Sequence, residues 1–303
     1  MNIETKWLYD FLTLAELRNF SQAAELRNVT QPAFSRRIKS LENALNAELV
    51  DRTKTPVELT PSGKQFRITA RSIISQFDEE ISRLAGLSML GGQAVRIAAP
   101  HSVATNLLPD FHPVIEGKVP LAALNIEAVD VDDAVEALQQ GRCDMLIAFR
   151  EERLLLPPYQ HVHLGRSYLD LVTANTPAGE PLFNAQSKNL PWLSYSAGSY
   201  MGRAVEPVRK SLPLQTTFSS SMSDLLKVMV LRGTGVGWLP RYAIGHEISS
   251  GRLSVIEQSD FSIPIDIYAY RYESRLPPAG EKVWQALSAE KLPTLDVIYP
   301  LPG

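Results

Sequence analysis

Residues 19–66 read NFSQAAELRNVTQPAFSRRIKSLENALNAELVDRTKTPVELTPSGKQF, and the first half of this stretch predicts two short helices joined by a tight turn. The first helix is expected over residues 21–27, with Ser21 as its N-cap. The second is expected over residues 31–45, with Thr30 as its N-cap. Two such helices, the second polar and basic toward its N-terminus, are typical of a helix-turn-helix.

The helix predicted over residues 31–45 has an apolar and a polar face. Pro32 lies in its first turn, where a missing N–H leaves no helical hydrogen bond unmade. The stretch 27–39 contains basic residues and no acid, although the whole chain has a net charge of −3. A local basic patch of this kind can neutralise DNA phosphates, whatever the charge of the whole chain. The alternative interpretation of these cations is a helix face that is simply solvated. The basic residues are Arg27, Arg36, Arg37 and Lys39, and the apolar positions are Phe34, Ile38, Leu41 and Leu45.

Two short extended stretches follow, at residues 48–50 and 56–60. Between them lies the sequence DRTKT, residues 51–55, which carries two cations. A basic hairpin tip beside a recognition helix is expected to act as a wing that reaches the minor groove or the DNA backbone.

These residues carry a resemblance to a known family. The motifs F-S-x-A-A, V-T-Q-P-A-x-S-R-x-I, S-L-E and L-T-x-x-G occur in order, and the stretch resembles the winged helix-turn-helix of the LysR-type transcriptional regulators. The chain departs from the family pattern in two places. It has Val50-Asp51 where Leu-Phe usually precedes the wing arginine, and Asn46 where glycine usually ends the recognition helix. Asparagine tolerates the left-handed conformation of a helix C-cap, and Val50 still offers an apolar side chain before the wing. Both departures therefore affect the details of packing and leave the resemblance intact.

The resemblance implies sequence-specific binding to duplex DNA, with RNA polymerase as an indirect partner. Gln31, Ser35 and Arg36 are expected at base edges, and most of the other positions at phosphates. The full set of expected DNA-binding residues is Thr30, Gln31, Pro32, Ser35, Arg36, Arg37, Lys39, Arg52 and Lys54.

A long helix is predicted over residues 64–88, followed by a hinge at 89–93. Its apolar residues alternate in steps of three and four over three heptads, which indicates a coiled-coil seam; the alternative is an amphipathic helix that packs on its own domain. In the resembled family this helix is the dimer contact, and dimers of that family assemble further to tetramers. The expected dimer residues are Phe66, Ile73, Phe77, Ile81 and Leu84.

From residue 94 onward the pattern alternates between strands and helices, which is typical of an α/β fold with right-handed crossovers. One helix is expected to start at residue 101 and to run toward residue 111. Two lobes with two crossing connections resemble the effector-binding domain of the same family, which is similar in fold to periplasmic solute-binding proteins. The expected domains are residues 1–62 (DNA binding), 63–92 (linker helix and hinge) and 93–303 (effector binding), with lobe I at 93–165 and 269–303 and lobe II at 166–268.

Ligands of open α/β sheets bind at the carboxyl ends of strands, beside helix N-termini. Serine-rich segments and one arginine lie at such ends and favour a small anion or polar molecule, although N-capping by serine explains part of the pattern. The residues expected to bind an effector are His101, Ser102, Val103, Asp130, Arg150, Ser199, Tyr200, Ser220 and Ser221.

Several short strings, among them SYMGR and SSMSDLLK, resemble a branch of the family that responds to hypochlorite through methionine oxidation. Met201 and Met222 fall inside these strings. Conversion of a thioether to a sulfoxide makes the side chain polar, which would alter closure of the lobes. The alternative is that both methionines fill gaps in the core.

Other functional classes find little support in the residue pattern. A single cysteine, Cys143, excludes a disulfide framework, and His161 and His163 lack a metal-ligand partner at a recognisable spacing. No catalytic motif, cofactor or metal site is expected, and neither a signal peptide nor an apolar run long enough for a membrane is seen, so the cytoplasm is the expected location. The remaining alternatives are a solute-binding protein without a regulatory role and a constitutive DNA-binding protein without an effector.

Overall fold

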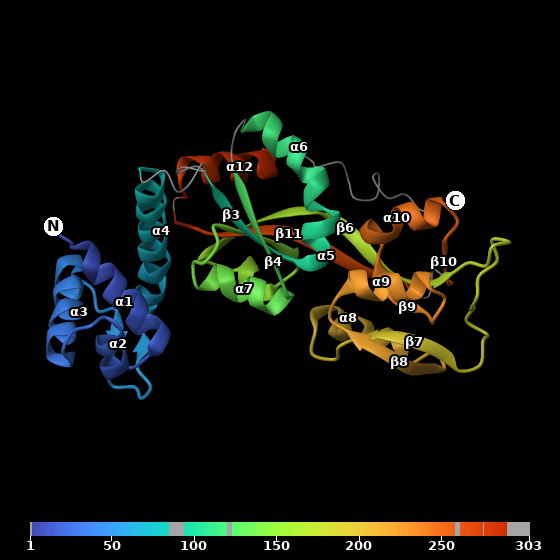
Figure 1. Cartoon of the computed structure of the whole chain (residues 1–303), viewed down its shortest axis with the longest axis horizontal. Coiled ribbons are helices and arrows are strands. Elements are labelled where there is room, and N and C mark those ends of the chain that lie inside the picture. The colour runs from blue at the N-terminus through green and yellow to red at the C-terminus, as the bar shows by residue number, and fades with distance from the viewer. Residues whose placement is uncertain (1, 85–93, 120–122, 258–260, 275, 290–303) are drawn as a thin grey trace. The chain divides into compact units, whose positions relative to one another are not determined.

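The computed structural model describes residues 2–84, 94–119, 123–257, 261–274 and 276–289 (Figure 1). The chain divides into two compact units, one of residues 1–94 with 137–143 and the other of residues 95–136 with 144–303. We call the first the DNA-binding unit and the second the regulatory unit.

Three helices open the DNA-binding unit: α1 (Thr5–Leu17), α2 (Phe20–Leu26) and α3 (Gln31–Leu45). The bounds predicted for α3 are confirmed, and Asn46 ends it in the left-handed conformation (φ 50°, ψ 41°). The predicted N-cap of α2 is wrong. Asn19, and not Ser21, caps this helix, because its side-chain oxygen accepts hydrogen bonds from the backbone N–H groups of Ser21 and Gln22.

A small apolar core joins these helices to the start of α4 (Pro61–Leu84). The wing is a two-stranded antiparallel hairpin of β1 (Val50–Asp51) and β2 (Glu58–Leu59). Helices α1, α2 and α3 contact one another pairwise, and α1 also contacts α4. The fully buried residues of this core include Phe11, Phe34, Ile38 and Leu41.

Helix α4 has one face in this core and one face open. Ala70 and Ile74 are buried, and the Phe66 ring packs on Phe11 with 5.4 Å between ring centroids. Phe66 is half-buried and already has a ring contact within its own chain, and its place in a dimer seam stays a prediction. The hinge predicted at residues 89–93 and the side chain of Leu84 lie outside the described residues.

The regulatory unit is built on a seven-stranded sheet with the order β10-β6-β11-β5-β3-β4, where β10 is Leu253–Val255 and β9 (Gly237–Pro240) also pairs with β6. Strands β3 (Val95–Pro100), β4 (Leu124–Val129) and β5 (Met145–Phe149) are parallel to one another. Strands β6 (Tyr159–Ala174) and β11 (Ile263–Tyr272) are antiparallel, and each runs through a lobe boundary predicted at 165/166 or 268/269. The two crossing connections are thus two paired strands.

A second, parallel pair of strands, β7 (Leu190–Tyr195) and β8 (Leu214–Ser220), belongs to the other lobe. It is surrounded by α8 (Tyr200–Arg209) and α9 (Ser223–Leu231), with β9 (Gly237–Pro240), α10 (Arg241–Ser249) and β10 (Leu253–Val255) completing the lobe. Spacing did not predict α10, because buried residues lie on more than one of its faces.

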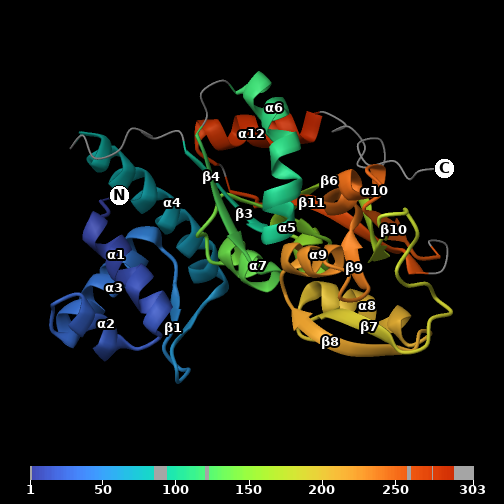
Figure 2. The same ribbon diagram turned by 45° about the vertical axis from the view of Figure 1, so that its right-hand side comes forward.

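The first lobe carries α5 (His101–Asn106), α6 (Leu108–Lys118), α7 (Val131–Gln139), a 3₁₀ turn (Glu152–Leu155) and α12 (Pro278–Ala289). Helices α6 and α12 pack on each other on one side of the sheet (Figure 2). The single helix predicted from residue 101 toward 111 is wrong. It breaks at Leu107 because Pro109, in the first turn of α6, has no N–H to continue the helical hydrogen bonds of α5.

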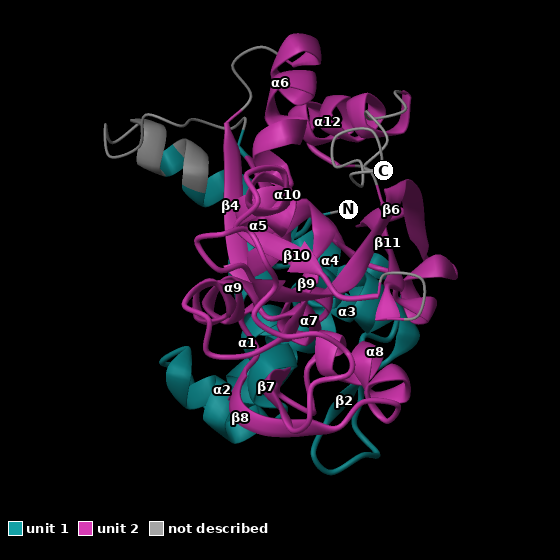
Figure 3. Cartoon of the chain, turned by 90° about the vertical axis from the view of Figure 1, so that its right-hand side faces the viewer, with its two compact units in different colours: residues 1–94, 137–143 teal, residues 95–136, 144–303 magenta. Residues whose placement is uncertain are grey.

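Figure 3 distinguishes the two units by colour. No described helix is both long enough and apolar enough to span a membrane.

Candidate DNA-binding and regulatory sites

The exposed face of α3 carries the side chains predicted to read bases. Gln31 and Arg36 are exposed and Ser35 is half-buried. The Gln31 Nε2 donates a hydrogen bond to the Ser35 Oγ at 3.1 Å, so these two polar groups hold each other on one side of the helix. Among the described residues, Arg36 and Lys39 form no hydrogen bond or ion pair, which leaves both cations open to a ligand.

Arg37 is not open in the same way, because it contacts a buried carboxylate. Asp10 on α1 has no exposed surface, and its two oxygens accept hydrogen bonds from Arg27 Nε at 2.8 Å and from Arg37 Nη1 at 3.2 Å. Asp10 is a residue that the sequence reasoning missed. Its signal is an acid placed directly between Tyr9 and Phe11 in the apolar stripe of a helix.

The wing is held by a second buried carboxylate, Glu42 at the end of α3. Its Oε1 accepts hydrogen bonds from the backbone N–H groups of Leu49 and Val50, and its Oε2 accepts one from Arg52 at 2.8 Å. Arg52, predicted at a phosphate, therefore also ties the wing to the recognition helix. Lys54 at the wing tip is exposed and forms no hydrogen bond or ion pair within the part of the chain that the structure describes.

The open face of α4 is apolar. Ile73, Phe77 and Ile81 are 46%, 50% and 50% exposed, and they are spaced by four residues along one side of the helix. Three of the five side chains predicted for the dimer seam thus lie unburied on one surface.

The regulatory unit contains a cleft between its two lobes, with a cavity of about 430 Å³ and a smaller one beside it. Helices α8 and α9 of one lobe begin at this cleft, and α5 and the end of β4 contribute to it from the other lobe. Eight of the predicted effector and redox residues line it. They are His101, Ser102, Asp130, Ser199, Tyr200, Met201, Ser221 and Met222.

Three predicted effector residues are not among those that line these two cavities, and the structure contradicts one of them, Val103. Val103 is fully buried in the core, because it lies on the inner face of α5. The Arg150 guanidinium pairs with Glu152 at 2.7 Å, which raises the pKa of Arg150. The Ser220 Oγ accepts the backbone N–H of Met222 before α9.

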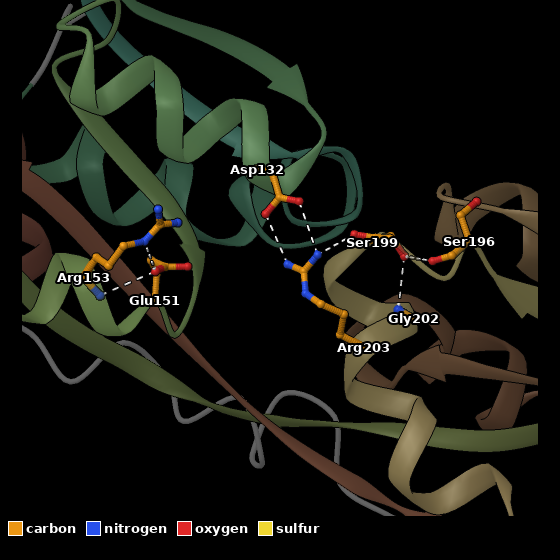
Figure 4. Close-up of polar contacts among 8 residues, drawn as sticks. Asp132, Glu151, Arg153, Ser196, Ser199, Gly202 and Arg203 are labelled. Carbon is orange, nitrogen blue, oxygen red and sulfur yellow. Dashed lines mark hydrogen bonds and ion pairs between the residues drawn. The ribbon is translucent and has the colours of Figure 1, made fainter.

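Two of the lining serines have internal partners. Ser199 caps α8: its Oγ accepts the N–H of Gly202 at 3.1 Å and donates to the carbonyl of Ser196 at 2.8 Å (Figure 4). Ser102 is buried, and its Oγ lies 3.0 Å from the hydroxyl of Tyr242. Helix capping therefore explains the position of Ser199, which is the alternative that the sequence analysis left open.

The charges of the cleft differ from those predicted. Asp132 and Asp133, at the start of α7, line it together with Asp130. Arg203 on α8 reaches across to Asp132, with its Nη2 and Nη1 at 3.2 and 3.4 Å from the two carboxylate oxygens, and it also contacts the carbonyl of Gly198 (Figure 4). Arg203 and Asp132 thus form an ion pair between the lobes, which a single sequence does not reveal because the two residues are 71 positions apart.

Aromatic and sulfur groups complete the cleft. The Tyr200 ring stacks on Phe149 of the opposite lobe at 4.8 Å, and burial raises the pKa of Tyr200 to about 12, so its hydroxyl stays protonated. Met201 is 4% exposed and Met222 is 43% exposed. Both methionines line the smaller cavity, one as a buried and the other as an accessible side chain.

The pair considered for metal binding packs elsewhere. His161 and His163 both contact the Tyr268 ring, and the Nε2 of His163 lies 3.1 Å from the carboxylate of Asp266. The described residues contain no group of three or more histidine, cysteine or acidic side chains arranged for a metal ion.

Comparison with known families gives two matches that cover most of the chain. Residues 5–64 match the family "Bacterial regulatory helix-turn-helix protein, lysR family", and residues 91–291 match the family "LysR substrate binding domain".

Individual relatives are similar over nearly full length. The HTH-type transcriptional regulator YjiE of Escherichia coli is 46% identical over 289 residues, which cover 94% of each chain. The structure of DarR from Vibrio fischeri in complex with DNA is 49% identical (TM-score 0.63; 96% of this chain and 100% of that chain). The full-length structure of HypT from Salmonella typhimurium, a hypochlorite-specific LysR-type regulator, is 42% identical (TM-score 0.62; 95% and 98%).

Proposed function

The chain belongs to the LysR family of transcriptional regulators, DNA-binding proteins with an effector-binding domain, and we propose that oxidation of Met201 and Met222 in its inter-lobe cleft is the signal that changes its activity. One observation carries this proposal: the two methionines line the same small cavity, and Met222 is accessible to an oxidant in solution. The similarity to HypT, whose description names hypochlorite, supports the same chemistry.

The proposed reaction needs only the thioethers of the chain and an oxidant. Hypochlorite transfers its oxygen to the methionine sulfur, which becomes a sulfoxide, and leaves as chloride. Met222 reacts first because it is exposed. A polar sulfoxide then stands beside the buried Met201 and the stacked rings of Phe149 and Tyr200, and the lobes respond by changing their packing.

The test is to treat the purified protein with mild hypochlorite, map sulfoxides by mass spectrometry and assay a reporter gene. A variant with both Met201→Gln and Met222→Gln, which imitates the polar sulfoxide, should be active without oxidant, and the corresponding Leu variants should stay unresponsive. Met229→Leu, on helix α9, which Met222 precedes, is the matched control. Sulfoxides confined to other methionines, with a silent Gln variant, would refute oxidant sensing.

A second candidate signal is a small polar ligand, which the cavity of about 430 Å³ favours by its size. An anion would face Asp130, Asp132 and Asp133, so its binding requires that Arg203 exchange Asp132 for the ligand. Ser102 lines the smaller, adjacent cavity, so Ser102→Ala should weaken a ligand that extends into that cavity by about 1 kcal/mol, the value of a typical hydrogen bond. A thermal-shift screen in which no small molecule stabilises the protein, together with an unchanged response to oxidant, would favour a constitutive DNA-binding protein.

On the DNA side, we propose that a homodimer, assembling to a tetramer, binds a pseudo-palindromic site in the cytoplasm, with RNA polymerase as an indirect partner. Gln31, Ser35 and Arg36 read bases. The apolar face of Ile73, Phe77 and Ile81 is the contact between copies, since an exposed apolar stripe on a helix favours association. Gel-shift titrations against a library of duplexes test the specificity directly.

A further inference from the structure

The DNA-binding unit contains a cluster of three charged side chains, of which the predicted DNA contacts include only Arg37. Asp10 on α1 lies between Arg27, at the end of α2, and Arg37 on α3. One oxygen of the carboxylate accepts from Arg27 at 2.8 Å and the other accepts from Arg37 at 3.2 Å. We propose that Arg27, Asp10 and Arg37 form a preorganised clamp for one phosphate of the DNA backbone, in which Asp10 is the positioning residue. This inference rests on the proposed DNA binding.

The charge of the cluster favours an anion. One carboxylate and two guanidinium groups leave a net charge of +1, and the carboxylate has no exposed surface, so water does not compete for its oxygens. Each arginine has five N–H donors and uses one of them on Asp10. About 30% of each arginine side chain is exposed, so the remaining donors are within reach of a ligand.

The cluster is also rigid, which distinguishes it from ordinary surface cations. The Arg27 guanidinium lies over the Tyr9 ring, 5.4 Å from its centroid, while its Nε is bound to Asp10. Tyr9 in turn donates a hydrogen bond to Asp78 on α4 at 2.6 Å. A planar guanidinium that is held on one edge and one face keeps its orientation, so little side-chain entropy is lost when a phosphate binds.

Its position on the helix-turn-helix is suited to a backbone contact. Arg37 directly follows Arg36, which is predicted at a base edge, and Arg27 precedes the turn into α3. Phosphate contacts beside base-reading residues fix the register of a protein on the duplex. Arginine is favoured for this role because its forked donors match the phosphate oxygens.

The decisive variant is Asp10→Asn, because two explanations predict opposite results. If the local charge alone matters, loss of a negative group should tighten DNA binding. If Asp10 orients the two arginines, the affinity for duplex DNA should fall about tenfold, although the protein becomes more positive. The slope of log K against log salt concentration should also become smaller in magnitude by about one, because one phosphate contact is lost. The probe is a fluorescently labelled 40-base-pair duplex of mixed sequence. Its binding is measured by fluorescence anisotropy at several KCl concentrations.

Glu25→Gln is the matched control, since Glu25 is an exposed acid on α2, two residues before Arg27. It should leave the salt dependence unchanged. If Asp10→Asn does not fold, as judged by circular dichroism, Arg27→Lys replaces it: this variant keeps the charge and a donor toward Asp10 but loses the planar fork. A lower salt dependence in Arg27→Lys supports the clamp, and an unchanged one overturns it.

The outcomes separate the clamp from the proposed function. Wild-type protein that shows no salt-dependent binding to duplex DNA would refute DNA binding itself. Wild-type binding with equal or tighter binding by Asp10→Asn would overturn the clamp alone. A variant that is less stable but binds the duplex with wild-type affinity and salt dependence would assign Asp10 to folding only, and would also overturn it.

Discussion

The two units of this chain organise their charged groups in opposite ways. In the DNA-binding unit, the carboxylates of Asp10 and Glu42 are buried, and each holds an arginine near the recognition helix or the wing. In the cleft of the regulatory unit, Asp132 and Arg203 form an ion pair whose side chains are both more than half exposed. A buried carboxylate that loses its partners is strongly destabilising, whereas an exposed ion pair contributes little.

This difference matches what each surface has to do. The partner of the DNA-binding unit is a rigid duplex, so cations held in advance by buried acids bind it with little loss of entropy. The cleft is where we propose that a signal acts, and contacts of low energy between its lobes allow two arrangements to be close in free energy.

The largest effect is expected at the apolar face of α4. Phe77→Glu removes an exposed ring and adds a charge where two copies are proposed to meet, and it should cost roughly 4 kcal/mol of dimerisation, because about 2 kcal/mol of burial is lost in each copy. Sedimentation at micromolar concentration should show monomers. Gln76→Glu adds the same charge at the neighbouring position and should remain dimeric; a monomeric wild type would contradict the assignment of this face.

Removal of a buried carboxylate should be nearly as severe. Glu42→Ala leaves the buried N–H groups of Leu49 and Val50 without an acceptor, and it should destabilise the DNA-binding unit by about 3 kcal/mol. Hydrogen–deuterium exchange of α1 and α3 in the intact protein measures this unit separately. Glu58→Ala, which breaks an exposed pair with Arg18, should cost less than about 1 kcal/mol. Equal losses in the two variants would erase the contrast between buried and exposed acids.

The open cations of the DNA-binding unit should affect binding and not folding. Arg36→Ala should cost about 1–3 kcal/mol and relax the preference at one base pair. Lys54→Ala at the wing tip should weaken all sequences alike and reduce the salt dependence by about one. Gel-shift titrations at several salt concentrations separate the two results, and identical behaviour of both variants would contradict their division into base and phosphate contacts.

The exposed pair in the cleft should change the response more than the stability. Asp132→Asn and Arg203→Gln should each shift the free energy of unfolding by less than about 1 kcal/mol. The same variants should alter the oxidant or ligand concentration that gives half-maximal reporter output, because the pair joins the two lobes. If either variant lowered the free energy of unfolding by more than about 2 kcal/mol, the ion pair of the cleft would contribute to stability as the buried carboxylates of the DNA-binding unit do.

The smallest effect concerns pH. The Arg166 guanidinium, which donates two hydrogen bonds to Asp266, and the His163 ring beside it lower the pKa of Asp266. A carboxyl whose pKa is lower in the folded protein contributes stability at pH values above its unfolded pKa of about 4, and this contribution disappears as the pH falls through the lowered value. Between pH 5 and pH 2, the free energy of unfolding should therefore fall slightly more in wild type than in Asp266→Asn, as measured by thermal unfolding. The difference should be below about 1 kcal/mol, because the pair is partly solvated. An identical drop in both would exclude this contribution.

Much of the DNA-binding unit could be predicted because its determinants are local. The apolar spacing of Phe34, Ile38 and Leu41 gave the correct face of α3, and the open cation Arg36 lies on the same short segment. The contacts of Arg37 and Phe66 inside the chain were not predicted. Their partners, Asp10 and Phe11, lie on α1, and no spacing within the later helices indicates them.

The regulatory cleft was predicted in part. Rules for strand ends identified Ser102 and Ser221, because helix N-termini mark that edge of the sheet. The two methionines came instead from the resemblance of short strings to one branch of the family. The strand-end rules also selected Val103, which points into the core, and they missed Asp132 and Arg203. A strand-end rule locates a segment, but it does not tell which of its side chains is turned inward.

The sequence by itself determined the winged helix-turn-helix, the two-lobed α/β architecture and the family, because helical periodicity and ordered short motifs act over a few neighbouring residues. Only the tertiary structure decided which charges are paired and which are open. Residues as far apart as Asp10 and Arg37, or Asp132 and Arg203, meet through the packing of separate helices. Burial then sets the strength of each pair, since a carboxylate removed from water needs its partner while one at the surface does not.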